Sequence, residues 1–317
     1  MSNLPALSDL PIVPVVIEPP TFPRKTIYTL NVDNYEPRIR ELTYPLMAAF
    51  AKKIGAETVE ITGRNRPDWP ITIEKFQVAE ASVQRGDDWS IFIDADTLIS
   101  PEMFDPTEHM SMDTVAHNGK DMSGIRWGYD KYFRRDSRHI GSCTWFVIAS
   151  RWCVEDLWAF PQDDLETTLS KINITIQERA SGHCKTEHLI DDYTLSRNIA
   201  RFGLKFDTIT DICGRLGYKN PDGRAFNPYL WHKYTMGTDQ KVLEMLGILA
   251  TPNGQPAFPI GVKGEIITVG NGIPVLKTSI PTLYGPEGSM IGSIGQGWGQ
   301  MSREDVMDFC RRWNMGV

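Results

Sequence analysis

The chain has 317 residues, with 33 lysines and arginines against 40 aspartates and glutamates, and its net charge is −7. This acidic balance argues against a protein that coats nucleic acid over its whole surface, although a local basic groove remains compatible with it. A chain of this length can form one large α/β domain with a tail, or two domains.

The sequence contains five cysteines and no C-x-x-C pair, which gives no support to a zinc site or a redox motif. We expect reduced, mostly buried thiols of an intracellular protein at Cys143, Cys153, Cys184, Cys213 and Cys310. No window holds the ~20 apolar residues of a membrane span, and prolines interrupt the N-terminal apolar stretch before a signal-peptide core could form. The sequence therefore predicts a soluble, cytoplasmic protein.

Prolines dominate residues 1–24 and disfavour both a helix and a central strand there, so we expect an extended arm. Strand and helix patterns then alternate, with strands at 25–32, 56–62 and 89–94, a helix from Pro37 that Pro45 should kink, and a helix over 71–85. This alternation over a short span indicates parallel strands joined by crossover helices, as in a nucleotide-binding half-sheet. Ligands of such sheets lie at the carboxyl ends of the strands.

The second half of the chain continues with a strand within 140–152, a helix over 188–203 and a strand over 204–212. Asp191 is the expected N-cap of that helix and Gly203 its C-terminal stop. Glycine and proline become frequent toward the C-terminus, and a last helix follows Ser302, which can serve as its N-cap. We expect residues 246–317 to form an extension that packs on the main domain or on another subunit of a homo-oligomer.

Two aspartates follow the apolar strand in the stretch WSIFIDADTLIS. In an extended segment residues two apart share a face, so Asp94 and Asp96 should point the same way while Ala95 points opposite. Two carboxylates that close repel each other unless a cation lies between them, and Mg²⁺ or Mn²⁺ prefers carboxylate and phosphate oxygens. The plainer alternative is that Asp94 caps a turn and Asp96 faces water.

The segment DDWSIFIDADTLISPEMF resembles the metal-binding segment of GT-A fold glycosyltransferases, which use sugar nucleotides as donors, and it is most similar to the yeast-type galactosyl- and mannosyltransferase group. The resemblance covers about residues 25–240. It implies an α/β, Rossmann-like GT-A fold with a mixed, mainly parallel sheet flanked by helices, here over residues 25–245.

Three later segments follow in the order of that family. GSCTWFVIAS resembles its glycine loop, where Gly141 and Ser142 would let the backbone approach a sugar, although a plain turn explains it equally. IDDYTLSRNIARFGLKF is similar to its x-E-D element. The resemblance implies that Asp192 is the catalytic aspartate and that Asp191 takes the position of the family's glutamate, with a shorter side chain. The alternative is that Asp191 caps the helix and Asp192 only complements its dipole. WHKY offers His232 as a third metal ligand.

The resemblance also implies a donor-binding set near the first strand's end and the D-x-D segment. For one member, Lys75, the alternative to donor binding is an ordinary exposed lysine on an amphipathic helix. The set is Thr29, Asn31, Asp33, Arg64, Lys75 and Ala95.

Basic and aromatic residues alternate in DKYFRRDSRHIG, where Arg134 and Arg138 could contact an acceptor, a donor diphosphate or a nucleic acid. A solvated loop that pairs with the acidic surface is the simplest interpretation.

Together these features predict a glycosyltransferase that moves a sugar from a UDP- or GDP-sugar to a hydroxyl acceptor, a glycan or another small molecule, with Mn²⁺ or Mg²⁺ as cofactor. Glycosylation of a modified base in DNA is the first alternative. A nucleotidyltransferase is a second, but the segment after the first strand, LNVDNYEPR, lacks the glycines of a triphosphate loop. A non-catalytic nucleotide-sugar-binding protein is the third.

Overall fold

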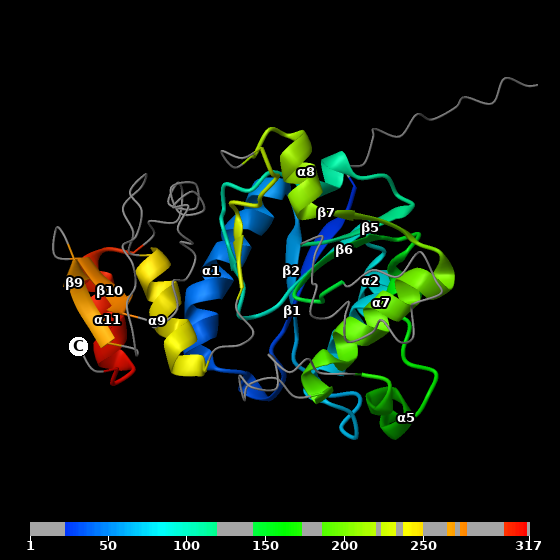
Figure 1. The fold of residues 1–317 in the computed structure, drawn as a ribbon, viewed down its shortest axis with the longest axis horizontal. Coiled ribbons are helices and arrows are strands. Elements are labelled where there is room, and N and C mark those ends of the chain that lie inside the picture. Colours follow the sequence, from blue (N-terminus) through cyan, green and yellow to red (C-terminus); the bar gives the residue numbers. More distant parts are fainter. Residues whose placement is uncertain are drawn as a thin grey trace, which may run out of the picture.

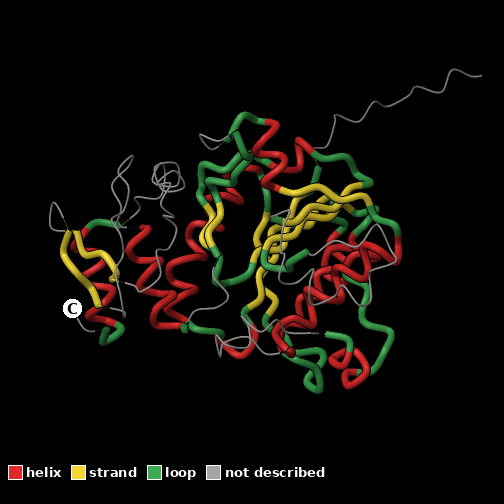
Figure 2. Tube along the Cα trace, viewed as in Figure 1, coloured by secondary structure: helices red, strands yellow, loops and turns green. Residues whose placement is uncertain are grey.

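A six-stranded sheet with the strand order β2-β1-β3-β6-β5-β7 forms the centre of the molecule (Figures 1 and 2). The computed structural model describes residues 23–118, 142–172, 186–219, 223–232, 237–249, 265–269, 273–277 and 301–315. β6 runs antiparallel to both of its neighbours, and the other pairs are parallel. The strands are β1 (Lys25–Leu30), β2 (Glu57–Ile61), β3 (Trp89–Ile93), β5 (Thr114–His117), β6 (Phe146–Ser150) and β7 (Lys205–Thr208). The predicted mixed, mainly parallel α/β sheet is confirmed.

The central strands are buried on both faces, so they read as continuous apolar runs. In β3, Ile91 faces one apolar core and Phe92 the other, as the two-residue period of a strand requires. Figure 1 shows α1 with α9 and α11 on one side of the sheet, and α2 with α7 on the other. These helices are α1 (Pro37–Ile54), α2 (Gln77–Arg85), α7 (Ile190–Phe202), α9 (Thr238–Leu249) and α11 (Arg303–Arg312).

The remaining elements are short. The helical ones are η2 (Val32–Asn34), η3 (Ile71–Phe76), η4 (Pro106–His109), α4 (Val154–Leu157), α5 (Leu165–Ser170), η5 (Thr186–Leu189) and α8 (Ile209–Arg215). Two further antiparallel pairs join β4 (Leu98–Ile99) to β8 (Leu230–Trp231) and β9 (Glu265–Val269) to β10 (Ile273–Lys277).

Helix α1 begins and ends where the sequence predicts. Pro37 occupies the first turn, where its missing N–H is not needed, and Gly55 ends the helix in the left-handed conformation at φ 68°. Pro45 lies inside the helix as expected.

Two predicted elements are corrected. The helix predicted over 71–85 starts as the 3₁₀ helix η3, because buried Glu74 accepts the backbone N–H groups of Asn65 and Arg66 and holds this turn against the preceding loop. The strand predicted over 204–212 stops at Thr208. The Oγ1 atom of Thr208 accepts the backbone N–H of Asp211 at 2.9 Å and thereby caps α8.

The C-terminal helices pack on the same core as α1. Val306 and Phe309 of α11 are each 1 % exposed and belong to the cluster that includes Ile39 and Phe50. Trp313, just after α11, donates its indole N–H to Glu41 of α1 at 2.8 Å. The expected boundary near residue 245 falls inside α9, and residues 1–22 of the expected arm lie outside the described residues.

The four cysteines that the structure describes are buried free thiols, as expected: Cys143, Cys153, Cys213 and Cys310. Cys184 lies outside the described residues. In the described part of the chain, no helix has the length and hydropathy to cross a membrane.

Candidate functional site

The two aspartates after β3 reach the same site through a turn. Asp94 is the first residue beyond the strand, and its carbonyl accepts the backbone N–H of Thr97 at 3.0 Å. Residues 94–97 therefore form a turn between β3 and β4. The carbonyl of Ala95 accepts the hydroxyl of Thr43 on α1 at 2.6 Å, which fixes the turn against the helix. The carboxylates of Asp94 and Asp96 therefore converge because of a turn, not because of the extended backbone that the sequence suggested.

The short β4–β8 pair brings His232 to this turn from far along the chain. Leu98 pairs with Trp231 in antiparallel register, so the residue after β8 lies beside the turn that precedes β4. His232 Nε2 is 3.2 Å from Asp96 Oδ1. One oxygen each of Asp94 and Asp96 and one nitrogen of His232 lie within 4.8 Å of one another.

This donor set fits a divalent cation. The two carboxylates are ligands that Mn²⁺ and Mg²⁺ prefer, the imidazole is a ligand more typical of transition-metal ions, and the ligand atoms are close enough to share one ion. Trp145, just before β6, supports both halves of the cluster. Its carbonyl accepts the N–H of Asp94 at 2.8 Å, and its ring stacks on that of His232.

Lys75 connects this cluster to a second acidic pair. Its ammonium group is 2.8 Å from Asp94 Oδ1, 2.8 Å from Asp191 Oδ2 and 3.0 Å from Thr144 Oγ1. The side chain is 5 % exposed, so the alternative of a solvated surface lysine does not hold. Burial disfavours the ammonium, but Asp191 and Asp94 outweigh burial and raise the pKa of Lys75 above its ordinary value.

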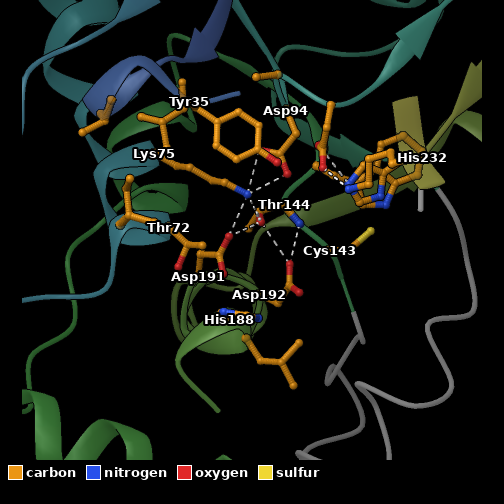
Figure 3. Close-up of a pocket in the computed structure, with 18 of the residues that line it drawn as sticks. Tyr35, Thr72, Lys75, Asp94, Cys143, Thr144, His188, Asp191, Asp192 and His232 are labelled. Carbon is orange, nitrogen blue, oxygen red and sulfur yellow. Dashed lines mark hydrogen bonds and ion pairs between the residues drawn. The ribbon is translucent and has the colours of Figure 1, made fainter. Parts of the chain in front are cut away.

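Thr144 holds the two consecutive aspartates at the start of α7. Its backbone N–H donates to Asp192 Oδ1 at 2.6 Å, and its hydroxyl contacts both Asp191 and Asp192 (Figure 3). Asp191 was expected to cap the helix, but Leu189 is the N-cap residue and makes no side-chain cap bond. The side chain of Asp191 turns instead to Lys75 and Thr144, and within the described residues its Oδ1 is buried without a partner.

The carboxylates respond to burial differently because their partners differ. Burial raises the pKa of Asp192 well above its ordinary value, and the neighbouring charge of Asp191 adds to the rise. Burial also raises the pKa of Asp94, and the neighbouring charge of Asp96 adds to the rise while Lys75 and His232 oppose it. At Asp96, His232 and Lys241 outweigh burial and hold its pKa below the ordinary range.

A cavity of about 370 Å³ joins the two clusters, which is within the ~300–1,000 Å³ range of small-molecule sites. Four carboxylates and two lysine ammonium groups line it, a formal excess of two negative charges that one divalent cation would balance. The wall at the ends of β1 and η2 is apolar and aromatic, from Leu30, Val32 and Tyr35. The cavity thus lies where α/β sheets place their ligands, at the carboxyl ends of the parallel strands.

The structure brings some of the expected site residues together and leaves others apart. Asp94, Ala95, Asp96, His232, Lys75, Asp191 and Asp192 all line the cavity.

Four of the expected donor-binding residues do not line this cavity: Thr29, Asn31, Asp33 and Arg64. Thr29 and Asn31 face α1 instead, because the alternation along the chain turns Leu30 and Val32 toward the cavity. Asn31 donates to Glu60 at 3.0 Å. Asp33 lies 3.5 Å from Arg64 and is largely exposed.

Arg64 and Ser142 are held in other environments. Arg64 donates to the carbonyl of Trp69 at 2.9 Å, and Ser142 is buried against Ser196, whose hydroxyl accepts its N–H at 3.1 Å. Neither lines the cavity. Gly141, Arg134 and Arg138 lie outside the described residues.

The polar and aromatic cavity residues that the sequence did not predict include Tyr35, Thr144, Trp145, His188 and Lys241. Thr144 and Trp145 lie in the segment taken for the glycine loop, so the segment was found but not the residues within it. Lys241 lies in α9, where no sequence motif distinguishes it.

Comparison with known proteins gives a fold-level likeness only. No protein-family model and no curated protein matches the sequence. Among solved structures, a glycosyltransferase involved in the glycosylation of the major capsid of PBCV-1 resembles the fold with a TM-score of 0.42 and 10 % sequence identity. The similarity covers 70 % of this chain and 98 % of that chain. Nothing in these comparisons places the chain in the yeast-type group.

Proposed function

We propose that this protein transfers a sugar from a nucleoside-diphosphate sugar to a hydroxyl acceptor, with Asp94, Asp96 and His232 as ligands of Mn²⁺ or Mg²⁺. One observation carries the proposal: these three side chains converge at the carboxyl ends of β1 and β3, in a cavity whose opposite wall carries Asp191 and Asp192. A bound cation would neutralise the charge that develops on the leaving diphosphate.

The two ends of the cavity suit the two halves of the donor. The apolar wall of Leu30, Val32 and Tyr35 offers an aromatic face to a nucleoside, and the acidic cluster lies beyond it. The unpartnered, buried Oδ1 of Asp191 is an acceptor for a sugar hydroxyl, since an unpaired buried carboxylate oxygen is costly without a donor.

Asp192 is the residue that would face the acceptor. Thr144 fixes its Oδ1, and burial raises its pKa, so its carboxylate is a stronger proton acceptor than an exposed aspartate. The bond from the anomeric carbon to the diphosphate breaks and a bond to the acceptor oxygen forms. In an inverting reaction the acceptor proton passes to Asp192. In a retaining one the acceptor proton passes to an oxygen of the departing diphosphate, and Asp192 orients the acceptor and stabilises charge.

Thermal unfolding with and without ligands tests the proposal. The full chain is heated with UDP, GDP and their sugar conjugates, each with and without Mn²⁺, and a bound ligand should raise the melting temperature by mass action. Asp94→Ala and Asp96→Ala should lose the Mn²⁺-dependent part of the rise. Asp113→Ala, which removes an exposed aspartate paired with Lys205, is the matched control and should keep it.

Each outcome separates the parts of the proposal. Absence of a metal-dependent rise with every nucleotide contradicts the sugar-nucleotide function, and a rise retained in both aspartate variants contradicts the metal ligands. Asp192→Asn should keep the rise with nucleotide and Mn²⁺ but lose turnover. Proton NMR of the product would then give the anomeric outcome.

A further inference from the structure

Two buried lysines already occupy the carboxylates that the cation would use. Lys75 contacts both carboxylate oxygens of Asp94, at 2.8 and 2.9 Å, and Lys241 pairs with Asp96 Oδ2. Both lysines are 5 % exposed and both line the cavity. Each of the two aspartates therefore has an ammonium partner of its own.

These pairs are not explained by stability. Taking an ammonium and a carboxylate out of water costs free energy that their attraction often fails to recover, so a buried ion pair is weak evidence for a stabilising role. Here two such pairs lie side by side in one cavity, brought together from η3 and α9. An arrangement of this cost is better explained by what the charges do when ligands arrive.

A divalent cation and the two ammonium groups compete for the same carboxylates. The cation alone gains two carboxylates but repels both lysines. The other carboxylates that line the cavity are those of Asp191, beside Lys75, and Asp192. A diphosphate changes this balance because its oxygens can accept both lysines. The four-carbon stem of lysine gives each ammonium group the reach to change partner without moving the backbone.

We infer that Lys75 and Lys241 pass from Asp94 and Asp96 to the donor diphosphate when the cation binds, so that cation and diphosphate bind with positive cooperativity. This inference rests on the proposed function and adds Lys241 to the diphosphate-binding residues. By linkage, the factor by which the diphosphate strengthens cation binding equals the factor by which the cation strengthens diphosphate binding.

The two lysines differ in how firmly they are held. Lys75 keeps Asp191 and Thr144 as acceptors after it releases Asp94. Within the described residues, Asp96 is the acceptor of Lys241. Lys241 is therefore the residue whose removal should affect the cooperativity most.

Cation affinity measured with and without a diphosphate tests the inference on the full wild-type chain. Mn²⁺ binding is followed by electron paramagnetic resonance alone, with inorganic pyrophosphate, with UDP and with GDP. Mn²⁺ should bind at least about tenfold more tightly with a diphosphate present, within the usual range of coupling between sites. Because pyrophosphate has no base or sugar, an effect of pyrophosphate assigns the coupling to the diphosphate itself.

Lys241→Met is the decisive variant. It should bind Mn²⁺ alone about tenfold more tightly than the wild type, because the competing ammonium is gone, and the gain from a diphosphate should fall to about threefold or less. Lys53→Met is the matched control, since Lys53 is an exposed lysine paired with Glu102, and it should behave as the wild type.

The melting temperature provides a second measurement, which remains informative if Lys241→Met is less stable than the wild type. Among the described residues, His232 is the ion-pair partner that Asp96 keeps when Lys241 is removed. Mn²⁺ without nucleotide should therefore raise the melting temperature of Lys241→Met by more than that of the wild type. Lys241→Gln keeps a hydrogen-bond donor for Asp96 without the charge. Like Lys241→Met, it should bind Mn²⁺ alone more tightly than the wild type and gain less from a diphosphate.

The outcomes distinguish this inference from the proposed function. If the wild type binds Mn²⁺ equally well with and without a diphosphate, or if Lys241→Met keeps the full cooperativity, the inference is overturned while a metal-dependent nucleotide site still stands. If neither Mn²⁺ nor any diphosphate binds, both the proposed function and the inference are overturned.

Discussion

The imidazole of His232 stacks on the indole of Trp145, with ring centroids 4.9 Å apart and planes inclined by 12°. The same tryptophan accepts the N–H of Asp94 through its carbonyl. One residue therefore orients two of the three candidate metal ligands, one through its ring and the other through its backbone.

Removing the indole should loosen only the histidine. Trp145→Ala keeps the carbonyl that holds Asp94 but leaves His232 without its ring partner, so we expect Mn²⁺ affinity, measured with UDP present, to fall about 10–100-fold, as for other groups that orient a metal ligand. Trp145→Phe should restore most of it because a ring face remains. Trp152→Ala removes a tryptophan that is 65 % exposed and should leave the affinity unchanged. Equal losses in Trp145→Ala and Trp145→Phe would contradict a role for stacking.

The hydroxyl of Thr144 links Lys75 to both aspartates of α7. Thr144→Val keeps the shape and the backbone N–H but leaves these buried charges without that hydroxyl, so we expect a loss of about 1–3 kcal/mol in the free energy of unfolding. Turnover should fall by at least about tenfold, because the orientation of Asp192 depends on it.

Thr144→Ser is the rescue variant, since it restores the hydroxyl. Urea unfolding and product formation are measured for both variants. If Thr144→Ser were as impaired as Thr144→Val, the lost methyl or local repacking would explain the result, not the hydrogen bonds.

Phe309 tests whether the C-terminal helix belongs to the main core. It is 1 % exposed and packs in the cluster that includes α1, so Phe309→Ala should destabilise the protein by about 3–5 kcal/mol. Unfolding monitored by circular dichroism and by tryptophan fluorescence should remain one transition that shifts as a whole. Phe206→Ala is the matched control because Phe206 is 42 % exposed. A separate early transition confined to the variant would indicate an independent C-terminal unit.

The sequence predicted the parts of the site that depend on local order. The sequence predicts the buried strand before Asp94 and the helix that follows the acidic pair, because apolar residues recur there with the periods of a strand and of a helix. Both acidic segments therefore fall at the ends of predicted elements. His232 came from the family resemblance, and its approach to Asp96 depends on the β4–β8 pair, two residues long on each side, which no periodicity reveals.

The failures have physical causes too. Thr29 and Asn31 were expected to contact the donor, but the alternation of side chains turns Leu30 and Val32, not them, toward the cavity. Asp191 was expected to cap the helix because aspartate is a common N-cap, whereas in the structure its carboxylate pairs with buried Lys75 and Leu189 is the N-cap residue. Lys241 could not be found, because its partner Asp96 lies 145 residues away.

His117 gives a pH dependence of stability that is independent of the cavity. It is 1 % exposed at the end of β5, stacked near Phe206, and within the described residues neither ring nitrogen has a hydrogen-bond partner. Burial lowers the pKa of His117 to about 4, although the charges of Asp211 and Asp207 oppose the shift. The folded protein thus keeps this ring neutral over a range in which the unfolded chain, with an ordinary pKa near 6.5, binds a proton.

The contribution of the neutral His117 ring to the free energy of unfolding is therefore at its full value above about pH 6.5, and it is lost as the pH falls toward 4. We expect the free energy of unfolding, from urea titrations, to drop by about 2 kcal/mol between pH 7 and pH 5 through this residue. His117→Leu should lack that drop and should be as stable as the wild type or more so at pH 7, because it replaces an unpartnered polar ring by an apolar side chain. His109→Gln, at an exposed histidine, should keep the wild-type slope. The same loss in wild type and His117→Leu would place the titrating group elsewhere.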